Sequence, residues 1–541
     1  MLTAVADRIV LLWGWRRFAT AFFAGAVSAL AQAPFHAFPL LWLTFPLLVW
    51  LIDGATVANA SGRLRRVRPG FAIGWWFGFG YFLAGLWWIG GAFLVEAEDF
   101  GWMLPFAIVL LPAGLALFYG LATGFARLFW SDDASRILVL AAAFGAAEWL
   151  RGHILTGFPW NGLGYAFAAN TLQMQAASLI GVEGLAVIAV LVFAAPAMLV
   201  GGNRQRLARI LLAAVVLLYA GLLLYGGIRL ATIEPGVNDT VRLRIVQPSI
   251  PQKEKWRPEN RERILQTYLE LSDRATSPDR LGVVSVTHII WPEAALPFLL
   301  RETPQALAAI AALLPPGTTL VTGATRADPA LPGEKRRRYY NSIYVVGHDG
   351  TILDAYDKVH LVPFGEYLPF QQTLESIGLQ QLTRRRGGFE AGTERSALKI
   401  PGAPPADPLI CYEIIFPSEV ALGDGDPQWM LNVTNDAWYG NTPGPYQHLH
   451  QARVRAVEQG VPVVRAANTG ISAIIDPLGR VKARLALEIS GVIDSELPRA
   501  IPATPYKNYG NLPLMVIILG LFLAAITIRV NNKKAFVNHH N

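Results

Sequence analysis

Cysteine and charged residues are both scarce in this chain of 541 residues. Cys411 is its only cysteine, which excludes an internal disulfide and a metal site built from several cysteines. Only 16% of the residues are charged, whereas an ordinary soluble protein carries about 25%. This composition excludes an ordinary cytosolic enzyme, and the 11% of aromatic residues excludes a disordered chain.

Long apolar runs divide the chain. Eight segments are apolar enough to predict membrane-spanning helices, at 17–34, 38–53, 70–93, 101–127, 137–153, 173–201, 208–231 and 512–530. Between them, β-rich runs alternate with amphipathic helices, which is typical of an α/β domain. We therefore predict transmembrane helices in 1–232 and 508–531, an α/β domain in 240–500 and a polar tail in 532–541. The stretch ending at Ala33 also resembles a signal-peptide cleavage site, an alternative that Pro34 and the later spans disfavour.

The basic residues of the membrane part predict its orientation. The net charge of +7 would suit nucleic acid, but these residues gather in alternate short loops, as they do on the cytoplasmic side of a membrane. They are Arg8, Arg16, Arg17, Arg63, Arg65, Arg66, Arg68, Arg127, Arg136, Arg204, Arg206, Arg209, Arg529, Lys533 and Lys534. The sequence therefore predicts both termini in the cytoplasm, the 240–500 domain in the periplasm of a bacterial inner membrane, and no nucleic-acid partner. ATP, NAD and acyl-CoA are not available there, so an enzyme would need a lipid or secreted donor.

Three reactive side chains follow apolar strands of the predicted α/β domain. Glu293 ends the run from Ile289, Lys358 follows Tyr356-Asp357, and Cys411 follows Leu409-Ile410. Strand ends that feed loops commonly carry catalytic groups in α/β folds. A thiol attacks only as the thiolate, so we expect Cys411 to be held ionised beside a carboxyl and an ammonium group. Glu293 would take the thiol proton if burial raised its pKa, and Lys358 would stabilise an oxyanion.

Each of these residues has a simpler interpretation when taken alone. Cys411 could be a small buried hydrophobic residue, Glu293 a helix cap and Lys358 an exposed strand residue. No metal site is predicted, because His448 and His450 do not face each other on a helix and no carboxylate–histidine cluster is evident beside them. The chain also has no glycine-rich phosphate loop in the required context, and no cofactor is expected.

Together, the three segments resemble the nitrilase (carbon–nitrogen hydrolase) superfamily. The resemblance rests on WPEAALP at 291–297, YDKVHLVPFGEYLP at 356–369 and CYE at 411–413, in that order. With the predicted spans, and with TGFPWNGLGY at 156–165, VQPSIPQKEKW at 246–256 and NVTNDAWYG at 432–440, the chain is similar to the apolipoprotein N-acyltransferase family.

The resemblance implies an α-β-β-α sandwich and a two-step acyl transfer. It assigns Cys411 as nucleophile, Glu293 as base and Lys358 as oxyanion stabiliser. The donor would be a membrane phospholipid, preferably phosphatidylethanolamine, and the acceptor the α-amino group of a diacylglyceryl-cysteine on an apolipoprotein. Glu366 and Glu413 match supporting acidic positions of the family, and Trp256, Tyr412 and Trp438 match aromatic or pocket positions. Trp160 is a candidate interface or acyl-chain contact, because tryptophan prefers the depth of the membrane surface. A cluster at Arg384, Arg385 and Arg386 could meet phosphate head groups, or be a solvated loop.

Two other functions remain open at this point. A membrane-anchored amidase or nitrilase would use the same three residues but would need one anchor rather than eight. A transporter with a substrate-binding domain would normally keep charged residues at membrane depth. The predicted spans contain few charged residues besides Glu148, Arg151 and Glu183, which disfavours this function.

Overall fold

The computed structural model describes residues 2–55, 63–200, 205–330, 337–376, 378–383, 387–420 and 426–538. The chain divides into two compact units. The helical unit contains Met1–Ile89, Pro105–Ile233 and Ala503–Asn541, and the sheet unit contains Gly90–Leu104 and Glu234–Pro502.

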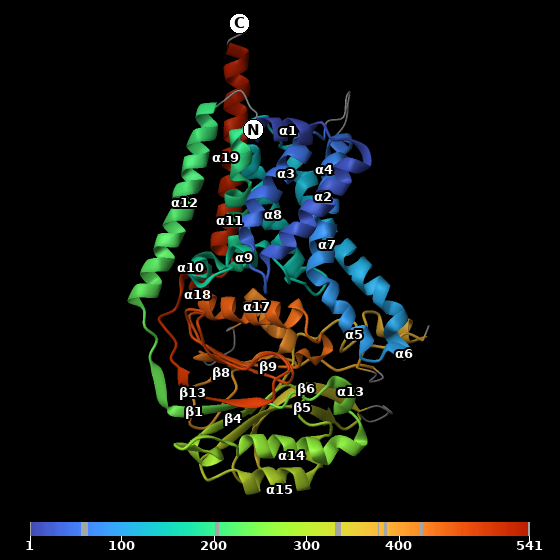
Figure 1. Ribbon diagram of the computed structural model, residues 1–541, viewed down its shortest axis with the longest axis vertical. Coiled ribbons are helices and arrows are strands. Elements are labelled where there is room, and N and C mark those ends of the chain that lie inside the picture. Colours follow the sequence, from blue (N-terminus) through green and yellow to red (C-terminus); the bar gives the residue numbers. More distant parts are fainter. Residues whose placement is uncertain are drawn as a thin grey trace. The chain divides into compact units, whose positions relative to one another are not determined.

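Helices make up the first unit (Figure 1). They are α1 (Leu2–Val10), α2 (Gly14–Ser28), α3 (Leu41–Asp53), α4 (Arg63–Leu86), α7 (Leu104–Leu128), α8 (Arg136–His153), α9 (Leu163–Phe167), α10 (Thr171–Met174), α11 (Ala177–Ala194), α12 (Gln205–Thr232), α18 (Pro505–Tyr509) and α19 (Leu512–Asn538). Glycines let α2 and α4 approach closely, because a Cβ on Gly25 would lie 1.9 Å from the Phe77 carbonyl oxygen and one on Gly80 would lie 2.0 Å from that of Phe22.

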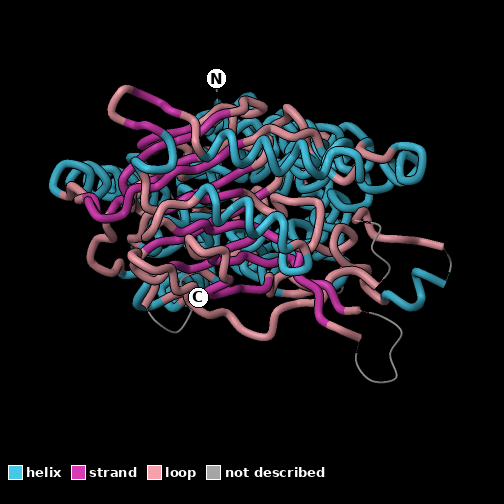
Figure 2. Tube along the Cα trace, turned by 90° about the horizontal axis from the view of Figure 1, so that it is seen from below, coloured by secondary structure: helices cyan, strands magenta, loops and turns pink. Residues whose placement is uncertain are grey.

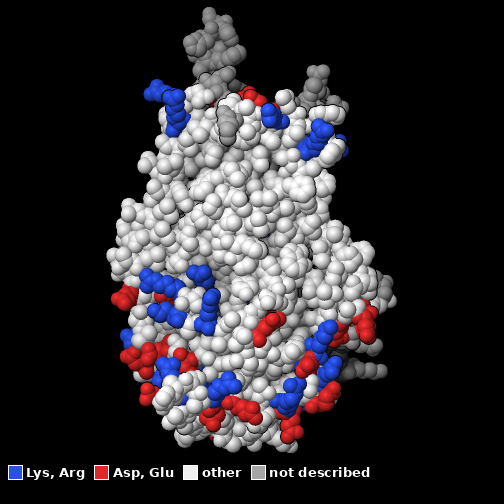
Figure 3. Space-filling model, viewed as in Figure 1, with Lys and Arg blue, Asp and Glu red and all other residues white. Residues whose placement is uncertain are grey.

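Among the described residues, five helices are long and apolar enough to cross a membrane: Val67–Leu94, Ala97–Leu128, Ala177–Leu199, Gln205–Thr232 and Leu512–Asn531. The face of the helical unit drawn in Figure 3 is correspondingly free of charged side chains over most of its length. The other three predicted spans fall short of these criteria. Helices α2 and α3 have only 15 and 13 residues, and α8 carries three charged residues, Arg136, Glu148 and Arg151. The count of eight therefore remains a prediction.

The sheet unit contains two main sheets. The first has the order β13-β1-β4-β5-β6-β7 and the second β12-β11-β10-β9-β8. The strands of the first are β1 (Val237–Gln247), β4 (His288–Trp291), β5 (Thr319–Asp328), β6 (Arg338–Val346), β7 (Ile352–Asp357) and β13 (Gly491–Pro498). Those of the second are β8 (Ala406–Ile410), β9 (Trp429–Thr434), β10 (Val463–Ala467), β11 (Ala473–Ile475) and β12 (Val481–Arg484), while β2 (Ala275–Ser277) and β3 (Arg280–Leu281) form a small hairpin.

Each main sheet contains three neighbouring parallel strands; antiparallel strands flank them on both sides in the first sheet and on one side in the second, where β8 is an edge strand. β1, β4 and β5 are parallel in the first sheet, and β8, β9 and β10 are parallel in the second. Helices complete the unit: α5 (Gly91–Leu94), α6 (Ala97–Phe100), α13 (Gln252–Lys255), α14 (Arg261–Ser272), α15 (Pro304–Leu313), α16 (Gln371–Ser376) and α17 (Pro443–Gln459).

Two hydrophobic cores order these elements into layers. One core lies between the sheets and joins Ile290 and Val321 of the first to Leu431 and Val464 of the second. The other lies between the first sheet and the helices α14 and α15, which contribute Ile264, Tyr268, Leu271 and Ile310. Figure 2 shows helices lying over the strands, and α17 packs on β10 of the second sheet. This layering is the predicted α-β-β-α sandwich.

Candidate active site

Cys411 lies at a sharp turn between a strand and a short 3₁₀-helix. Strand β8 ends at Ile410, and the 3₁₀-helix Cys411–Ile415 begins at the cysteine itself. Cys411 has a φ of +52°, in the left-handed region that residues other than glycine rarely adopt. Such strain is typical of functional sites when the surrounding structure holds it in place.

Glu413 holds this turn against the segment that carries Lys358. Its side chain is fully buried, and Oε2 accepts a hydrogen bond from the Ile410 amide at 2.7 Å. Oε1 accepts from the Tyr356 hydroxyl and the Val359 amide, both at 2.9 Å. One carboxylate therefore ties the end of β8 to both sides of Lys358, which follows β7. The predicted supporting residue Glu413 lies at this junction.

Lys358, Glu366 and Glu293 form a second buried network. The Lys358 Nζ lies 2.8 Å from Glu366 Oε2, which also accepts a hydrogen bond from the Val362 amide. The side-chain nitrogen of Asn341 donates to Glu293 Oε1 at 2.7 Å and to Glu366 Oε1 at 2.9 Å. Asn341 therefore sets the spacing of the two carboxylates, although the sequence analysis did not single it out.

The charges of Glu293 and Lys358 both act on the Cys411 thiol. Burial raises the pKa of the Glu293 carboxyl group, an effect that Lys358 partly offsets and Glu366 reinforces. Burial lowers the pKa of Lys358, but the carboxylates of Glu366 and Glu293 outweigh it and raise that pKa above its ordinary value. The site therefore contains a carboxylate with increased basicity beside an ammonium group that remains charged.

The electrostatics of the site favour a protonated resting thiol rather than the ionised one that the sequence analysis expects. Burial and the nearby Glu293 carboxylate raise the pKa of Cys411 well above its ordinary value, and Lys358 offsets only part of this rise. The resting thiol therefore keeps its proton. A base must take that proton when the sulfur attacks, and Glu293 is a suitable acceptor.

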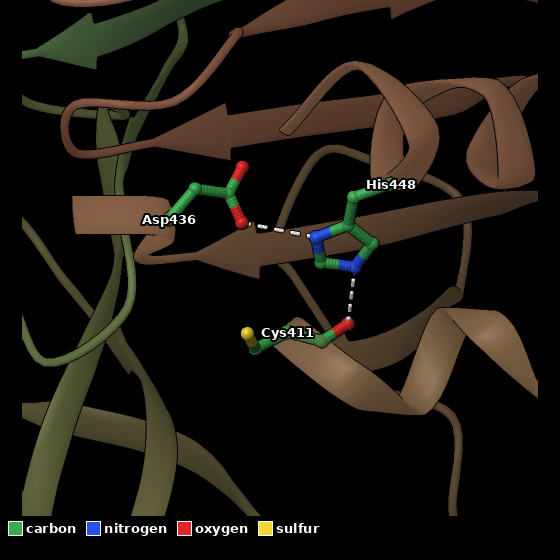
Figure 4. A group of neighbouring side chains, drawn as sticks. All are labelled: Cys411, Asp436 and His448. Carbon is green, nitrogen blue, oxygen red and sulfur yellow. Dashed lines mark hydrogen bonds and ion pairs between the residues drawn. The ribbon is translucent and has the colours of Figure 1, made fainter. Parts of the chain in front are cut away.

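A carboxylate–histidine pair also lies at Cys411 (Figure 4). His448 Nδ1 lies 3.0 Å from Asp436 Oδ1, and His448 Nε2 donates to the Cys411 carbonyl oxygen at 3.1 Å. The expectation that no carboxylate accompanies His448 is therefore wrong, because the chain brings Asp436 to it from the end of β9.

The Cys411 sulfur and one ligand atom each of Asp436 and His448 lie within 4.8 Å of one another. However, both nitrogens of the ring are engaged, and Arg465 donates to Asp436 at 2.8 Å. We do not assign a metal here.

The predicted aromatic residues lie in different surroundings. Tyr412 is buried, and its ring packs edge-on against Phe416 with centroids 4.9 Å apart. Trp256 is 44% exposed, and Trp438 is partly buried at the end of the short helix Asp436–Trp438. Trp160 is buried in the helical unit.

A buried ion pair anchors the loop around Trp160. Arg151 on α8 lies 2.5 Å from Glu148 Oε2 and donates to the carbonyl oxygen of Trp160 at 2.9 Å. The ring of Trp160 packs against that of Trp88, with centroids 5.1 Å apart. The cluster at Arg384, Arg385 and Arg386 lies outside the described residues.

Sequence reasoning missed Lys255, Asn341, Asp436 and the contact made by His448. Lys255 and Asp436 both fall within segments that carried the family resemblance, at 246–256 and 432–440. A lysine next to a tryptophan in a polar segment normally predicts an exposed side chain, yet Lys255 is fully buried beside Glu293. Nothing in the spacing of these residues along the chain indicates that they meet.

Comparison with known proteins matches both units to family models. A model described as carbon-nitrogen hydrolase matches residues 242–504, and one described as the apolipoprotein N-acyltransferase N-terminal domain matches residues 24–195. Among solved structures, an amidase from Nesterenkonia is similar with 19% identity and a TM-score of 0.35, over 49% of this chain and 93% of that chain.

Several curated proteins are similar over nearly the whole length. Proteins named apolipoprotein N-acyltransferase from Rhodopseudomonas palustris and Bradyrhizobium diazoefficiens are 51% and 50% identical, with 96% and 98% of both chains covered. One of the same name from Brucella suis is 47% identical over 99% of this chain and 100% of its own.

Proposed function

Because this chain belongs to the apolipoprotein N-acyltransferase family, we propose that it transfers a fatty acyl chain from a membrane phospholipid to the α-amino group of a diacylglyceryl-cysteine on apolipoproteins. The chain is an acyltransferase enzyme with a carbon–nitrogen hydrolase fold, and its apolar helices fit a multi-pass membrane protein. Cys411 carries the acyl group as a thioester between the two steps, and phosphatidylethanolamine is the proposed donor.

One observation carries the proposal. The Cys411 thiol lies at a strained turn within electrostatic range of both Glu293 and Lys358. These groups provide a nucleophile, a base and a cation for an oxyanion, which are the three parts that acyl transfer through a covalent intermediate requires.

The first step acylates the enzyme. The Cys411 proton passes to Glu293 while the sulfur attacks the ester carbonyl carbon of the phospholipid. Lys358 stabilises the negative oxygen of the tetrahedral intermediate, held in place by its 2.8 Å contact with Glu366. The carbon–oxygen bond then breaks, and Glu293 returns the proton to the departing oxygen. A lysophospholipid leaves, and the thioester remains.

The second step transfers the chain to the acceptor. The neutral α-amino group attacks the thioester carbonyl carbon, and Glu293 takes a proton from the nitrogen. The carbon–sulfur bond breaks, and Glu293 returns the proton to the Cys411 sulfur, so an amide forms and the thiol is regenerated. The thioester supplies the driving force, so no cofactor or nucleotide is needed. Excluding water from the acyl-enzyme favours transfer over hydrolysis.

The proposed arrangement in the membrane has eight spans. Seven lie in 1–232 and one in 508–531, with both termini and the 532–541 tail in the cytoplasm and the 240–500 domain in the periplasm. The distribution of Lys and Arg in short loops supports this orientation. A bacterial inner membrane supplies phospholipid in the same bilayer as the lipid-modified acceptor.

The proposal also gives roles to the remaining predicted residues. Glu366 and Glu413 position Lys358 and the Cys411 turn, which their hydrogen bonds support. Tyr412, Trp256, Trp438 and Trp160 are proposed lipid or pocket contacts, a role that suits the preference of tryptophan and tyrosine for membrane interfaces.

Incubation of purified protein with phosphatidylethanolamine vesicles, followed by a diacylated lipopeptide, tests the proposal. We expect an acyl adduct on Cys411 and then passage of the chain to the lipopeptide amine, with neither event in the Cys411→Ala variant. Release of the chain only to water would favour an amidase-like hydrolase. Absence of any adduct would favour a transporter that uses the sheet unit for binding.

A further inference from the structure

Buried carboxylates around Cys411 are matched by buried or partly buried cations. Three of them form the pairs Glu366–Lys358 at 2.8 Å, Glu413–Arg395 at 3.4 Å and Asp436–Arg465 at 2.8 Å. Glu293 is a fourth buried carboxylate, and Lys358, although close to it, is already paired with Glu366. The cation that lies beside Glu293 without such a pairing is Lys255.

Lys255 is completely buried, which is rare for a lysine. It ends the short helix α13, and its Nζ donates to the main-chain carbonyl oxygen of Glu293 at 3.2 Å. The helix is held in place because the side chain of Asn435 donates to Gln252 at 2.8 Å. Burial lowers the pKa of Lys255 to about 8, while the Glu293 charge opposes this lowering. The Lys255 ammonium group is therefore held out of water at the main chain of Glu293, where the charge of the Glu293 carboxylate acts on it.

We propose that Lys255 is the counterion of Glu293, a positioning residue that keeps the base ionised and able to accept the Cys411 proton. The role of that proton transfer rests on the proposed acyl transfer. The charges balance only when Lys255 is counted: Glu293 and Glu366 are negative, Lys255 and Lys358 are positive, and the thiol is neutral. Moving the proton from sulfur to Glu293 leaves this sum at zero.

Replacing Lys255 by an uncharged residue leaves a net negative charge in a buried site. Glu293 then holds a proton up to a higher pH, and negative charge on the sulfur or on an oxyanion is opposed. The ionisable groups that act on Glu293 or are acted on by it are Lys255 of α13, Lys358 after β7, Glu366 in the following loop, Cys411 after β8 and Tyr439 after β9. Of these, Lys358 and Lys255 are the cations.

The chain offers a matched control on the same helix. Lys255→Met removes the buried charge at nearly constant volume, whereas Lys253→Met removes an equal charge from an exposed position two residues earlier. The double variant Lys255→Met with Glu366→Gln restores the charge balance by releasing Lys358 to Glu293. Lys255→Gln provides a second neutral variant if the methionine variant melts at a lower temperature than the wild type.

Two pH profiles test the inference. One is the rate of Cys411 alkylation by iodoacetamide, which is unambiguous because the chain has a single cysteine. The other is the single-turnover rate of acyl-adduct formation from phosphatidylethanolamine. We expect both profiles of Lys255→Met to move to higher pH by about 1 unit, those of Lys253→Met to coincide with wild type, and those of the double variant to return toward wild type.

If the pH profiles of Lys255→Met coincide with those of the wild type, even at reduced amplitude, the inference is overturned. Lys255 would then have only a structural role. A double variant that stays shifted would also overturn it. If alkylation shifts as expected while the wild type forms no adduct, the counterion role stands and the proposed acyl transfer fails.

Discussion

The imidazole ring of His448 holds the backbone of Cys411, with Nε2 donating to the cysteine's carbonyl oxygen at 3.1 Å. Cys411 has a φ of +52°, and this hydrogen bond holds its carbonyl from outside the strained turn. Asp436 lies 3.0 Å from the other ring nitrogen and orients the ring (Figure 4). The nucleophile is therefore positioned through its backbone.

Loss of this contact should slow acylation. We expect His448→Leu to reduce the rate of adduct formation by roughly tenfold, because a buried carbonyl loses its donor at a cost of about 1–3 kcal/mol. His448→Gln, whose amide can reach the same oxygen, should recover much of the rate. Single-turnover kinetics at saturating phospholipid separates this effect from binding. Equal rates for wild type and His448→Leu would contradict the positioning role.

Glu293→Gln should slow acylation by at least about 100-fold, because a general base of this kind contributes that much or more. In the wild type, the rate should rise with pH as Glu293 loses its proton. Burial raises the pKa of that carboxyl group above its ordinary value of 4.5, so the rise should lie above pH 4.5. A Glu293→Gln variant that keeps the wild-type pH dependence would remove Glu293 from the role of base.

Asp436 should stabilise the fold in a pH-dependent way. Burial would raise its pKa, but Arg465 and His448 outweigh burial and lower it from 3.8 to about 2. A lowered pKa contributes stability above the ordinary value, and this contribution is lost as the pH falls from 3.8 toward about 2. Asp436→Asn should therefore be less stable than wild type at neutral pH by about 2 kcal/mol, with the difference shrinking in acid.

Unfolding of the detergent-solubilised protein at neutral pH and at about pH 3 measures this difference. The exposed Asp239 of β1 provides a control, since Asp239→Asn should match wild type at both values. A deficit for Asp436→Asn that is equally large in acid would show that charge is not its cause.

The proposed orientation predicts which exposed loops face the periplasm. In a Cys411→Ala background, which has no cysteine, we expect Ser277→Cys in the exposed hairpin of β2 and β3 to react with a membrane-impermeant maleimide added from the periplasm. Asp132→Cys, exposed between α7 and α8, should react only after the inner membrane is opened. The reverse pattern would place the sheet unit in the cytoplasm.

Much of the sheet unit could be predicted from the sequence. The apolar segments expected before Glu293, Lys358 and Cys411 are the strands β4, β7 and β8, each of which ends just before its reactive residue. The strands that the sequence analysis does not anticipate are β2 and β3 of the small hairpin and the edge strands β12 and β13. Edge strands pair on one side only and carry charged residues; β12 (Val481–Arg484) has two, both exposed, and therefore resembles a loop in composition.

The site was harder to predict than the fold. The chain order of Glu293, Lys358 and Cys411 indicated a shared chemistry, but the supporting residues come from elements distant in sequence. Lys255 is buried only because α13 docks on Asn435, and Asp436 reaches His448 only because β9 ends beside α17. Contacts of this kind depend on tertiary packing, and local sequence patterns do not indicate which distant residues will meet.

Mass spectrometry of the intact protein extracted from its own membrane tests the central claim most directly. The account predicts a mass increase of one fatty acyl group, located on Cys411, released by hydroxylamine and passed to an added lipopeptide amine. The Cys411→Ala variant should show no such adduct. An unmodified thiol in protein supplied with phospholipid and deprived of acceptor, or an acyl group on a different residue, would contradict it.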